Sequence, residues 1–382
     1  WDWDVTDDMT LTVGGRWSES DKSASRTEYV FTDVALSAML AGADRCFILG
    51  PGVGPDDQPE CLTTLSIPGQ GDVPLPPTVT EAADGGSWSN FSPKLGASYR
   101  IDDDLMIYGY YSQGFRDGGV EGAAANFRKF DREKLHAFEV GLKSDWSDGR
   151  LRVNAALFYY DYQDLQIELS QLVDNLVFTS VFNAGEAALT GAEIESTWQP
   201  NEMLQLSLNV GWLDSEITEL DRSDPSVDFG FVREGNEFGQ APAWTASLVP
   251  VVFFPLTRGS LTWRGEINYS ASYFQDFANG GFADETDAQI LTGANIANGV
   301  PPADAVVTPG TLIDSERLDS RVLVNTSLSY LSDDGRVELA IWARNLFEEE
   351  YTVNREFVNG LVYTNALYGA PRTYGANVSF RF

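Results

Sequence analysis

The last eleven residues, Arg372 to Phe382, read R-T-Y-G-A-N-V-S-F-R-F. Side chains of a β-strand point alternately to its two faces. One face of this segment therefore carries only polar residues and glycine, and the other carries Tyr374, Ala376, Val378, Phe380 and Phe382. A strand of a soluble sandwich could alternate in the same way, although the length also matches the roughly 9 to 11 residues of a tilted membrane-spanning strand. The segment alone predicts a strand with one apolar face.

The same alternation recurs along the chain and predicts twelve strands in all. The other eleven begin near Met9, Phe91, Leu105, Phe138, Leu151, Ala192, Leu204, Trp244, Leu261, Val322 and Val337. We expect no segment upstream of the first strand to pair with it. Short polar turns, such as S-D-D-G at 332–335, alternate with long connections. Charged and amide residues occupy one face, with bulky aromatic residues near the strand ends on the other, which is typical of an all-β, antiparallel transmembrane β-barrel with short periplasmic turns and long extracellular loops.

Charge is concentrated in the long connections. The formal net charge is −32, and residues 18–87, 213–240 and 279–319 together hold −20 of it. Nucleic-acid surfaces need clustered Lys and Arg, so no nucleic-acid partner is expected. The acidic stretches are interpreted as solvated loops that bridge divalent cations to lipopolysaccharide at the outer-membrane surface, with a specific cation or substrate site as the alternative.

Two cysteines, Cys46 and Cys61, lie in the expected extracellular loop 18–87, around the stretch P-G-V-G-P-D-D-Q-P. A Gly- and Pro-rich acidic loop with two cysteines predicts a disulfide, and hence an oxidising compartment. Two free thiols are the alternative. A metal site is less favoured because no histidine lies nearby.

Motifs for catalysis are sparse. The chain has one histidine, His136, so a two-histidine metal site is excluded, and neither a G-x-S-x-G elbow nor a P-loop is present. We expect His136 to be an ordinary residue at a strand start, and we predict no enzyme, no cofactor and no metal. The longest apolar run, Trp244 to Leu256, contains Pro250 and is too short for a spanning helix. Residues 1–20 show no export signal, so we expect that it was removed or that the numbering starts inside a longer protein.

An ordered set of motifs resembles the carboxyl-terminal barrel of TonB-dependent receptors over essentially the whole chain, residues 1–382. The motifs are Y-G-Y-Y-S-Q-G-F-R-D-G-G at 108–119, the strand 151–166 ending in D-L-Q, N-A-G-E-A-A-L-T-G-A-E-I-E at 183–195, N-L-F-E-E-E-Y at 345–351 and Y-G-A-P-R-T-Y-G at 368–375. The resemblance implies a 22-stranded barrel of which this chain supplies about 12 strands. It also implies an amino-terminal plug that contacts TonB, and both the plug and about ten strands are missing here.

The resemblance further implies an outer-membrane receptor that takes up a scarce nutrient, with a ferric siderophore as the default cargo. Cobalamin or an oligosaccharide is the alternative cargo, and a self-contained twelve-stranded pore or outer-membrane hydrolase is the alternative function. Other implied partners are outer-membrane lipid and the barrel-assembly machinery, which would read Phe382.

If the strands run up and down from a periplasmic start, several aromatic, hydroxyl and guanidinium groups reach the extracellular ends of the inward faces. These candidate ligand-binding residues are Tyr110, Ser112, Arg116, Tyr160, Tyr162 and Arg344. Aromatic faces with a few guanidinium groups suit a flat, anionic, partly aromatic ligand. Alternatively, the arginines pair with carboxylates of the wall or plug, such as Glu338.

Overall fold

The computed structural model describes residues 1–30, 64–67, 71–74, 78–123, 126–173, 176–223, 232–277, 317–358 and 363–382. The chain divides into two compact units. The first comprises Trp1–Ser20, Trp88–Gly118 and Phe130–Phe382, and the second comprises Asp21–Ser87 and Gly119–Lys129. Cys46 and Cys61 lie outside the described residues, so their disulfide stays a prediction.

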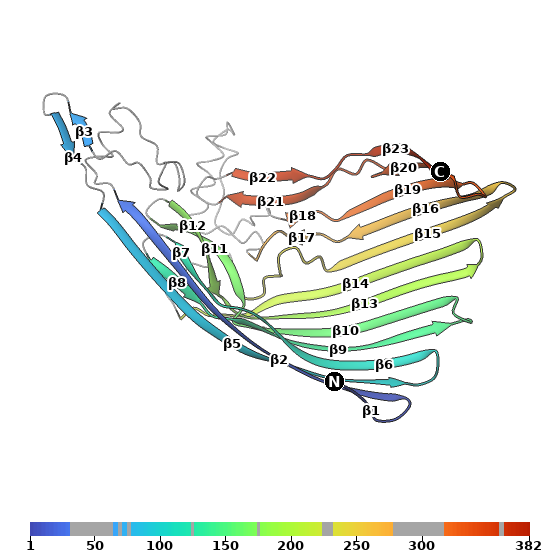
Figure 1. Cartoon of the computed structure of the whole chain (residues 1–382), viewed down its shortest axis with the longest axis horizontal. Helices are drawn as coiled ribbons and strands as arrows, with labels where there is room; N and C mark the ends of the chain where they lie inside the picture. The colour runs from blue at the N-terminus through green and yellow to red at the C-terminus, as the bar shows by residue number, and fades with distance from the viewer. Residues whose placement is uncertain are drawn as a thin grey trace, which may run out of the picture. The chain divides into compact units, whose positions relative to one another are not determined.

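One antiparallel sheet of thirteen strands dominates the first unit (Figure 1). Its strands pair in chain order, and the twelve predicted strands are all present. They are β2 (Met9–Val30), β5 (Thr78–Arg100), β6 (Leu105–Arg116), β9 (Glu133–Trp146), β10 (Leu151–Gln163), β13 (Gly185–Asn201), β14 (Leu204–Leu220), β15 (Trp244–Leu256), β16 (Gly259–Ser270), β19 (Arg321–Leu331), β20 (Val337–Arg344) and β23 (Thr373–Phe380).

The predicted short turns join neighbouring strands at one end of this sheet, and the long connections leave from the other. The turn between β9 and β10 places Gly149 at φ +78°, and the turn between β19 and β20 places Gly335 at φ +67°. Glycine adopts this left-handed region without the steric cost that other residues meet there. The glycines of the predicted polar turns are therefore the residues at which the chain reverses direction.

The expectation that nothing pairs with the first strand is wrong. A short strand, β1 (Asp2–Asp4), pairs with β2 through Asp2↔Thr12 and Asp4↔Thr10. Hydrogen bonds from the Thr10 and Thr12 hydroxyls to the Asp4 and Asp2 carboxylates support the pairing, at 2.7 and 2.6 Å. Three residues are too few to show a period-two pattern, which is why the sequence did not reveal this strand.

Strands also extend into segments expected to be loops. β2 continues to Val30 and β5 begins at Thr78, so the connection between them is shorter than the predicted range 18–87. The Gly-rich segment after Arg116 contains a hairpin of β7 (Gly119–Ala123) and β8 (Asn126–Phe130). Two further strands, β3 (Thr64–Ile67) and β4 (Gly71–Pro74), pair within the second unit.

The long-connection end of the first unit holds a buried apolar cluster. It lies around the hairpin of β11 (Gln166–Val173) and β12 (Leu176–Asn183) and consists of Leu165, Ile167, Leu169, Phe182, Ala184, Ala187, Ile217, Leu220 and Val232. The side-chain amide of buried Gln166 donates hydrogen bonds to the backbone carbonyl oxygens of Asp131 and Asp117, at 2.8 and 3.1 Å. Its buried N–H groups therefore have hydrogen-bond partners. This hairpin is therefore a packed element. Two short strand pairs complete the described elements: β17 (Tyr273–Phe274) with β18 (Arg317–Leu318), and β21 (Thr352–Val358) with β22 (Tyr363–Tyr368).

Within the residues that the structure describes, no helix has the length and apolar character needed to cross a membrane.

Candidate functional site

The register of the large sheet sorts its side chains onto two faces. Directly paired residues share a face, and the pairs Tyr110↔Glu139, Arg264↔Ser327 and Ser327↔Trp342 follow one face across the strands. We call this the polar face. The opposite face, which we call the apolar face, exposes large apolar side chains such as Val140 and Ile341, at 57 % and 58 % exposure. The predicted separation of polar from apolar residues is confirmed.

A first group on the polar face is the tyrosine cluster, which consists of Tyr108, Tyr110, Glu139, Lys94 and Lys143. The hydroxyls of Tyr108 and Tyr110 donate to the two oxygens of the Glu139 carboxylate, at 2.8 and 2.5 Å. Their rings are stacked at 6.4 Å, and the amino groups of Lys94 and Lys143 lie 5.1 and 5.8 Å from the Tyr110 and Tyr108 ring centres. These polar groups therefore satisfy one another.

Glycines opposite the rings explain why the aromatic side chains lie against the wall. A Cβ on Gly141 would fall 2.6 Å from the Tyr108 ring, and one on Gly191 would fall 2.2 Å from the Phe158 ring. An aromatic ring thus covers the space that a missing side chain leaves on the neighbouring strand, a known way of stabilising glycine in sheets. Phe158 in turn stacks on Tyr160, with ring centres 4.8 Å apart.

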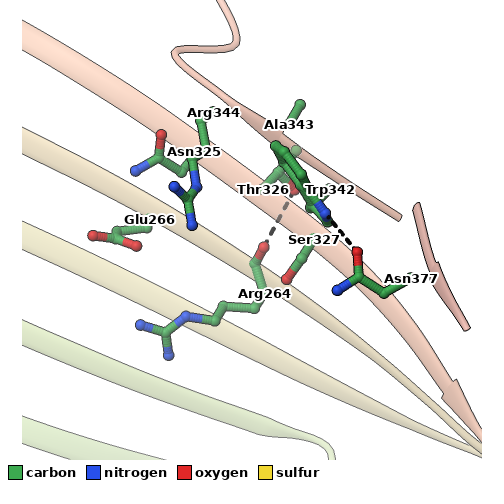
Figure 2. Close-up of a pocket in the computed structure, with 9 residues that line it drawn as sticks. All are labelled: Arg264, Glu266, Asn325, Thr326, Ser327, Trp342, Ala343, Arg344 and Asn377. Atoms are coloured by element: carbon green, nitrogen blue, oxygen red, sulfur yellow. Dashed lines mark hydrogen bonds between the residues drawn. The ribbon is translucent and has the colours of Figure 1, made fainter. Parts of the chain in front are cut away.

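A second group, the arginine hollow, lies on β16, β19, β20 and β23 (Figure 2). Its polar-face side chains are Arg264, Glu266, Asn325, Ser327, Trp342, Arg344 and Asn377, and its volume is about 310 Å³. The indole Nε1 of Trp342 donates to Asn377 Oδ1 at 3.1 Å, and the Arg344 guanidinium lies 5.4 Å from the Trp342 ring centre. The ring therefore forms a fixed flat wall beside a cationic group.

Neither guanidinium of the arginine hollow has an ion-pair partner in the described part of the chain. The carboxylate of Glu266 accepts a hydrogen bond from Asn268 Nδ2 at 2.9 Å. Glu338, the expected wall partner, lies six positions before Arg344 on β20, which is roughly 20 Å along a strand. Pairing of Arg344 with Glu338 is therefore excluded.

The structure brings three of the six candidate ligand residues together and separates three. Tyr110 and Ser112 share β6, and Tyr160 lies close by on β10. Arg116 is also on β6 but six positions from Tyr110, which is roughly 20 Å along the strand. Arg116 pairs in register with Glu133, whose carboxylate accepts a hydrogen bond from the backbone N–H of Gln166 at 2.7 Å.

Tyr162 and Arg344 lie apart from that group. Tyr162 packs against the buried apolar cluster, with its ring 5.6 Å from that of Phe238, so it contributes to packing at the long-connection end. Seven strands separate β6 from β20, so Arg344 is roughly 38 Å from Tyr110 along the sheet. The six residues therefore do not form one site.

Sequence reasoning did not predict that Arg264, Trp342 and Asn377 line one hollow with Arg344. The alternation had placed Arg264 and Trp342 on the inward face, but which strands adjoin across a long connection is not encoded in period-two spacing. His136 lies among the aromatic side chains of the apolar face, where the Tyr111 hydroxyl is 2.8 Å from its Nδ1. Phe382 is fully exposed. Its recognition by the barrel-assembly machinery stays a prediction.

Among the described residues, no group of three or more His, Cys, Asp and Glu side chains could hold a metal ion.

The chain matches the family model described as "TonB dependent receptor-like, beta-barrel" over residues 1–346. It belongs to the TonB-dependent receptor family.

Individual relatives are distant. The chain is 29 % identical over 128 residues to the pesticin receptor of Yersinia enterocolitica, which covers 33 % of this chain and 18 % of that protein. It is 28 % identical over 166 residues to the probable TonB-dependent siderophore receptor PiuA of Acinetobacter baumannii, covering 41 % and 21 %.

Solved structures share the fold at low identity. The ferric yersiniabactin uptake receptor FyuA from Yersinia pestis superposes with a TM-score of 0.64 at 18 % identity, over 100 % of this chain and 44 % of that one. The siderophore receptor PiuA from Acinetobacter baumannii gives a TM-score of 0.62 at 17 % identity, over 99 % and 42 %. The chain thus spans less than half the length of these TonB-dependent receptors.

Family membership assigns the faces of the sheet. TonB-dependent receptors are outer-membrane β-barrels, so this chain is an outer-membrane protein. In such barrels an apolar band faces lipid and the polar side chains line the interior. The tyrosine cluster and the arginine hollow therefore both belong to the lumen wall.

Proposed function

We propose that this chain forms part of a receptor that takes up a ferric siderophore across the outer membrane with energy supplied through TonB. The observation that carries the proposal is the match to the TonB-dependent receptor barrel over residues 1–346. Several similar proteins are named for such cargo: the solved FyuA is a ferric yersiniabactin uptake receptor, and Fiu of E. coli is a ferric-catecholate import receptor.

The lumen wall suits this cargo chemically. A ferric siderophore is a compact complex with oxygen-rich, often aromatic chelating groups, and it can bind through ring stacking and charge-assisted hydrogen bonds. The wall supplies both kinds of contact through Tyr160, Trp342 and the arginines of the hollow. Partners in this function are TonB, contacted by an amino-terminal plug, and the cargo itself.

The protein then acts as a transport receptor and catalyses no reaction. A passive pore is the competing function, and cobalamin or an oligosaccharide is the competing cargo. A pore would pass solutes without TonB, whereas a receptor would concentrate its cargo only when TonB is present. Dependence on TonB therefore separates the two functions.

The test is uptake of radioactive iron. The full-length product of the gene is expressed in a Gram-negative host that lacks its own siderophore receptors, with and without a functional tonB gene. The cells are supplied with iron as a ferric tris(catecholate), ferric citrate or a ferric tris(hydroxamate), with cobalamin and maltooligosaccharides in parallel. We expect TonB-dependent uptake of at least one ferric complex. TonB-independent uptake would support the pore. Uptake of only cobalamin or only oligosaccharide would show that this compound, and not a ferric siderophore, is the cargo.

A further inference from the structure

We infer that the arginine hollow is a binding site for an oxyanion-bearing arm of the cargo, so that the preferred siderophore complex carries net negative charge. The inference rests on the proposed function and adds to it a substrate class and a location in the barrel wall. It is carried by two guanidiniums that have no ion-pair partner among the described residues, by the hydrogen-bonded ring of Trp342 and by the neighbouring amide and hydroxyl groups.

The hollow lies in acidic surroundings. The chain has a formal net charge of −32, and the same polar face carries Glu139, Glu193 and Glu195. Arg264 and Arg344 nevertheless lie two strands apart in one hollow, and neither has an ion-pair partner among the described residues. The hollow contains these two guanidiniums and one carboxylate, Glu266, so its lining has a formal charge of +1 and attracts an anionic ligand.

The geometry selects a planar oxyanion. A guanidinium presents its N–H donors in a rigid fork that matches two oxygens of a carboxylate or a catecholate. Asn325, Ser327 and Asn377 also line the hollow and add hydrogen-bonding groups, with Asn325 beside Arg344 and Asn377 beside Trp342 (Figure 2). The hollow therefore offers more donors than its own carboxylate, Glu266, can use.

Trp342 adds an aromatic surface that is held in place from two sides. Its Nε1 donates to Asn377, and a Cβ on Gly375 would fall 2.6 Å from its ring, so the indole lies directly over that glycine. An aromatic chelating group could stack on the exposed side of the indole while its oxygens meet the guanidiniums. The volume of about 310 Å³ lies at the lower end of ligand pockets, which fits one arm of a siderophore.

A carboxylate of the plug is the competing occupant of the hollow. Lipid phosphates are not competitors, because the hollow lies on the lumen face. Cargo and plug differ in a measurable way: a cargo site changes affinity for anionic complexes, whereas a plug contact changes the stability of the receptor at unchanged affinity. The experiment therefore measures both quantities on the same variants.

The experiment uses the purified full-length receptor in detergent and titrates it with each ferric complex that the uptake assay shows to be transported. The ferric tris(catecholate) and ferric citrate are anionic, and the ferric tris(hydroxamate) is uncharged. The test variants are Arg264→Gln, Arg344→Gln and their double substitution. Arg336→Gln is the matched control, because Arg336 lies in the exposed turn before β20, outside the hollow.

For an anionic complex we expect each single substitution to weaken binding about 10-fold, the double substitution to weaken it more, and the control to leave it unchanged. Binding of the uncharged complex should change by less than about twofold in all variants. Lysine at either position should recover part of the affinity, because it keeps the charge and loses the fork. Reduced affinity for the anionic complex alone would support the inference.

Four results would overturn it. Unchanged affinity with a lower unfolding temperature in the double variant would assign the hollow to the plug. Equal loss for charged and uncharged complexes would indicate a general defect of the wall. A wild-type receptor that transports only the uncharged complex would refute the inference and leave the proposed function intact, whereas one that transports no ferric complex would refute both.

Discussion

The tyrosine cluster and the arginine hollow lie on the same face of the same sheet, yet they use their polar groups in opposite ways. In the tyrosine cluster a single carboxylate, Glu139, accepts hydrogen bonds from both phenol hydroxyls, and two ammonium groups lie over the rings. In the arginine hollow both guanidiniums lack an ion-pair partner within the described residues. Internal satisfaction stabilises a wall, whereas unused donors favour the capture of a ligand.

The contrast shows that aromatic and charged residues on a lumen wall do not by themselves mark a binding site. Tyr108 and Tyr110 have the residue type expected of a stacking platform, but their hydroxyls are already engaged. Trp342 also donates a hydrogen bond, but it does so along the wall to Asn377, and its ring borders an open hollow. Hydrogen-bond partners therefore separate the two regions better than residue type does.

The largest expected effect tests the premise that both regions face the lumen. Val140 lies beside the tyrosine cluster in sequence and Val324 lies beside the hollow, but both side chains are on the apolar face. Arginine at either position should destabilise the receptor by about 2–4 kcal/mol, because a charge at the bilayer midplane is costly. Asn209→Arg, on the polar face, should cost little. Urea unfolding of the full-length receptor in lipid vesicles measures the difference, and equal costs on both faces would contradict the barrel assignment.

The alternation of polar and apolar residues predicts some features of these regions and cannot predict others. The twelve strands, their tight turns and the two faces follow from period-two spacing and turn residues, and they were predicted. β1 was missed because three residues carry no period, and the β11–β12 hairpin because it follows β10 after only two residues and resembles its continuation. The arginine hollow requires contacts between β16 and β19, which a long connection separates. Only the three-dimensional pairing reveals them.

The next effect contrasts the two regions directly. Glu139→Ala removes the acceptor of two phenol hydroxyls, so the receptor should lose about 2–3 kcal/mol of stability. Arg264→Ala removes a side chain without an ion-pair partner in the described residues, so the loss should stay below about 0.5 kcal/mol. Both variants are measured by urea unfolding beside the wild type. A greater loss for Arg264→Ala would reverse our assignment of the two regions.

A smaller effect distinguishes the glycines beneath the aromatic rings. A Cβ on Gly141 would lie 2.6 Å from Tyr108 and 2.7 Å from the carbonyl oxygen of Ala155, which belongs to the backbone and cannot move aside. Gly141→Ala should therefore cost about 1–2 kcal/mol.

Gly375→Ala is the matched change in the hollow, because its nearest neighbours are atoms of the Trp342 ring alone. The ring can tilt, so the stability cost should be smaller than at Gly141, while affinity for an anionic ferric complex falls as the ring leaves Asn377. Urea unfolding and ligand titration of both variants test this pair. Unchanged affinity in Gly375→Ala would show that the ring position does not matter for binding.

The smallest expected effect concerns a hydrogen-bonded carboxylate outside the barrel wall. It tests whether such a carboxylate stabilises the folded protein as much as Glu139 on the wall is expected to. Asp334 lies in the turn between β19 and β20, outside the membrane, and accepts hydrogen bonds from the Ser332 hydroxyl at 2.6 Å and the Arg336 amide at 3.1 Å. The Ser332 bond and then the Arg336 bond lower the pKa of this carboxyl below its ordinary value of 3.8. Because the folded-state pKa is depressed, the stabilisation is complete above the ordinary value and is lost as pH falls through the folded value.

Asp334 is exposed to solvent, so Asp334→Ala should lower the urea midpoint less than any other destabilising change above. The difference from wild type should be present at neutral pH and shrink as the pH falls below about 4, because the wild-type carboxylate is then protonated and resembles the variant. Asp333→Ala is the matched control, since Asp333 lies next to Asp334 in the same exposed turn. A loss as large as that of Glu139→Ala would show that hydrogen-bond satisfaction outweighs burial. A loss that is small and disappears in acid would show that an exposed, hydrogen-bonded carboxylate stabilises the fold less than the half-buried Glu139 is expected to.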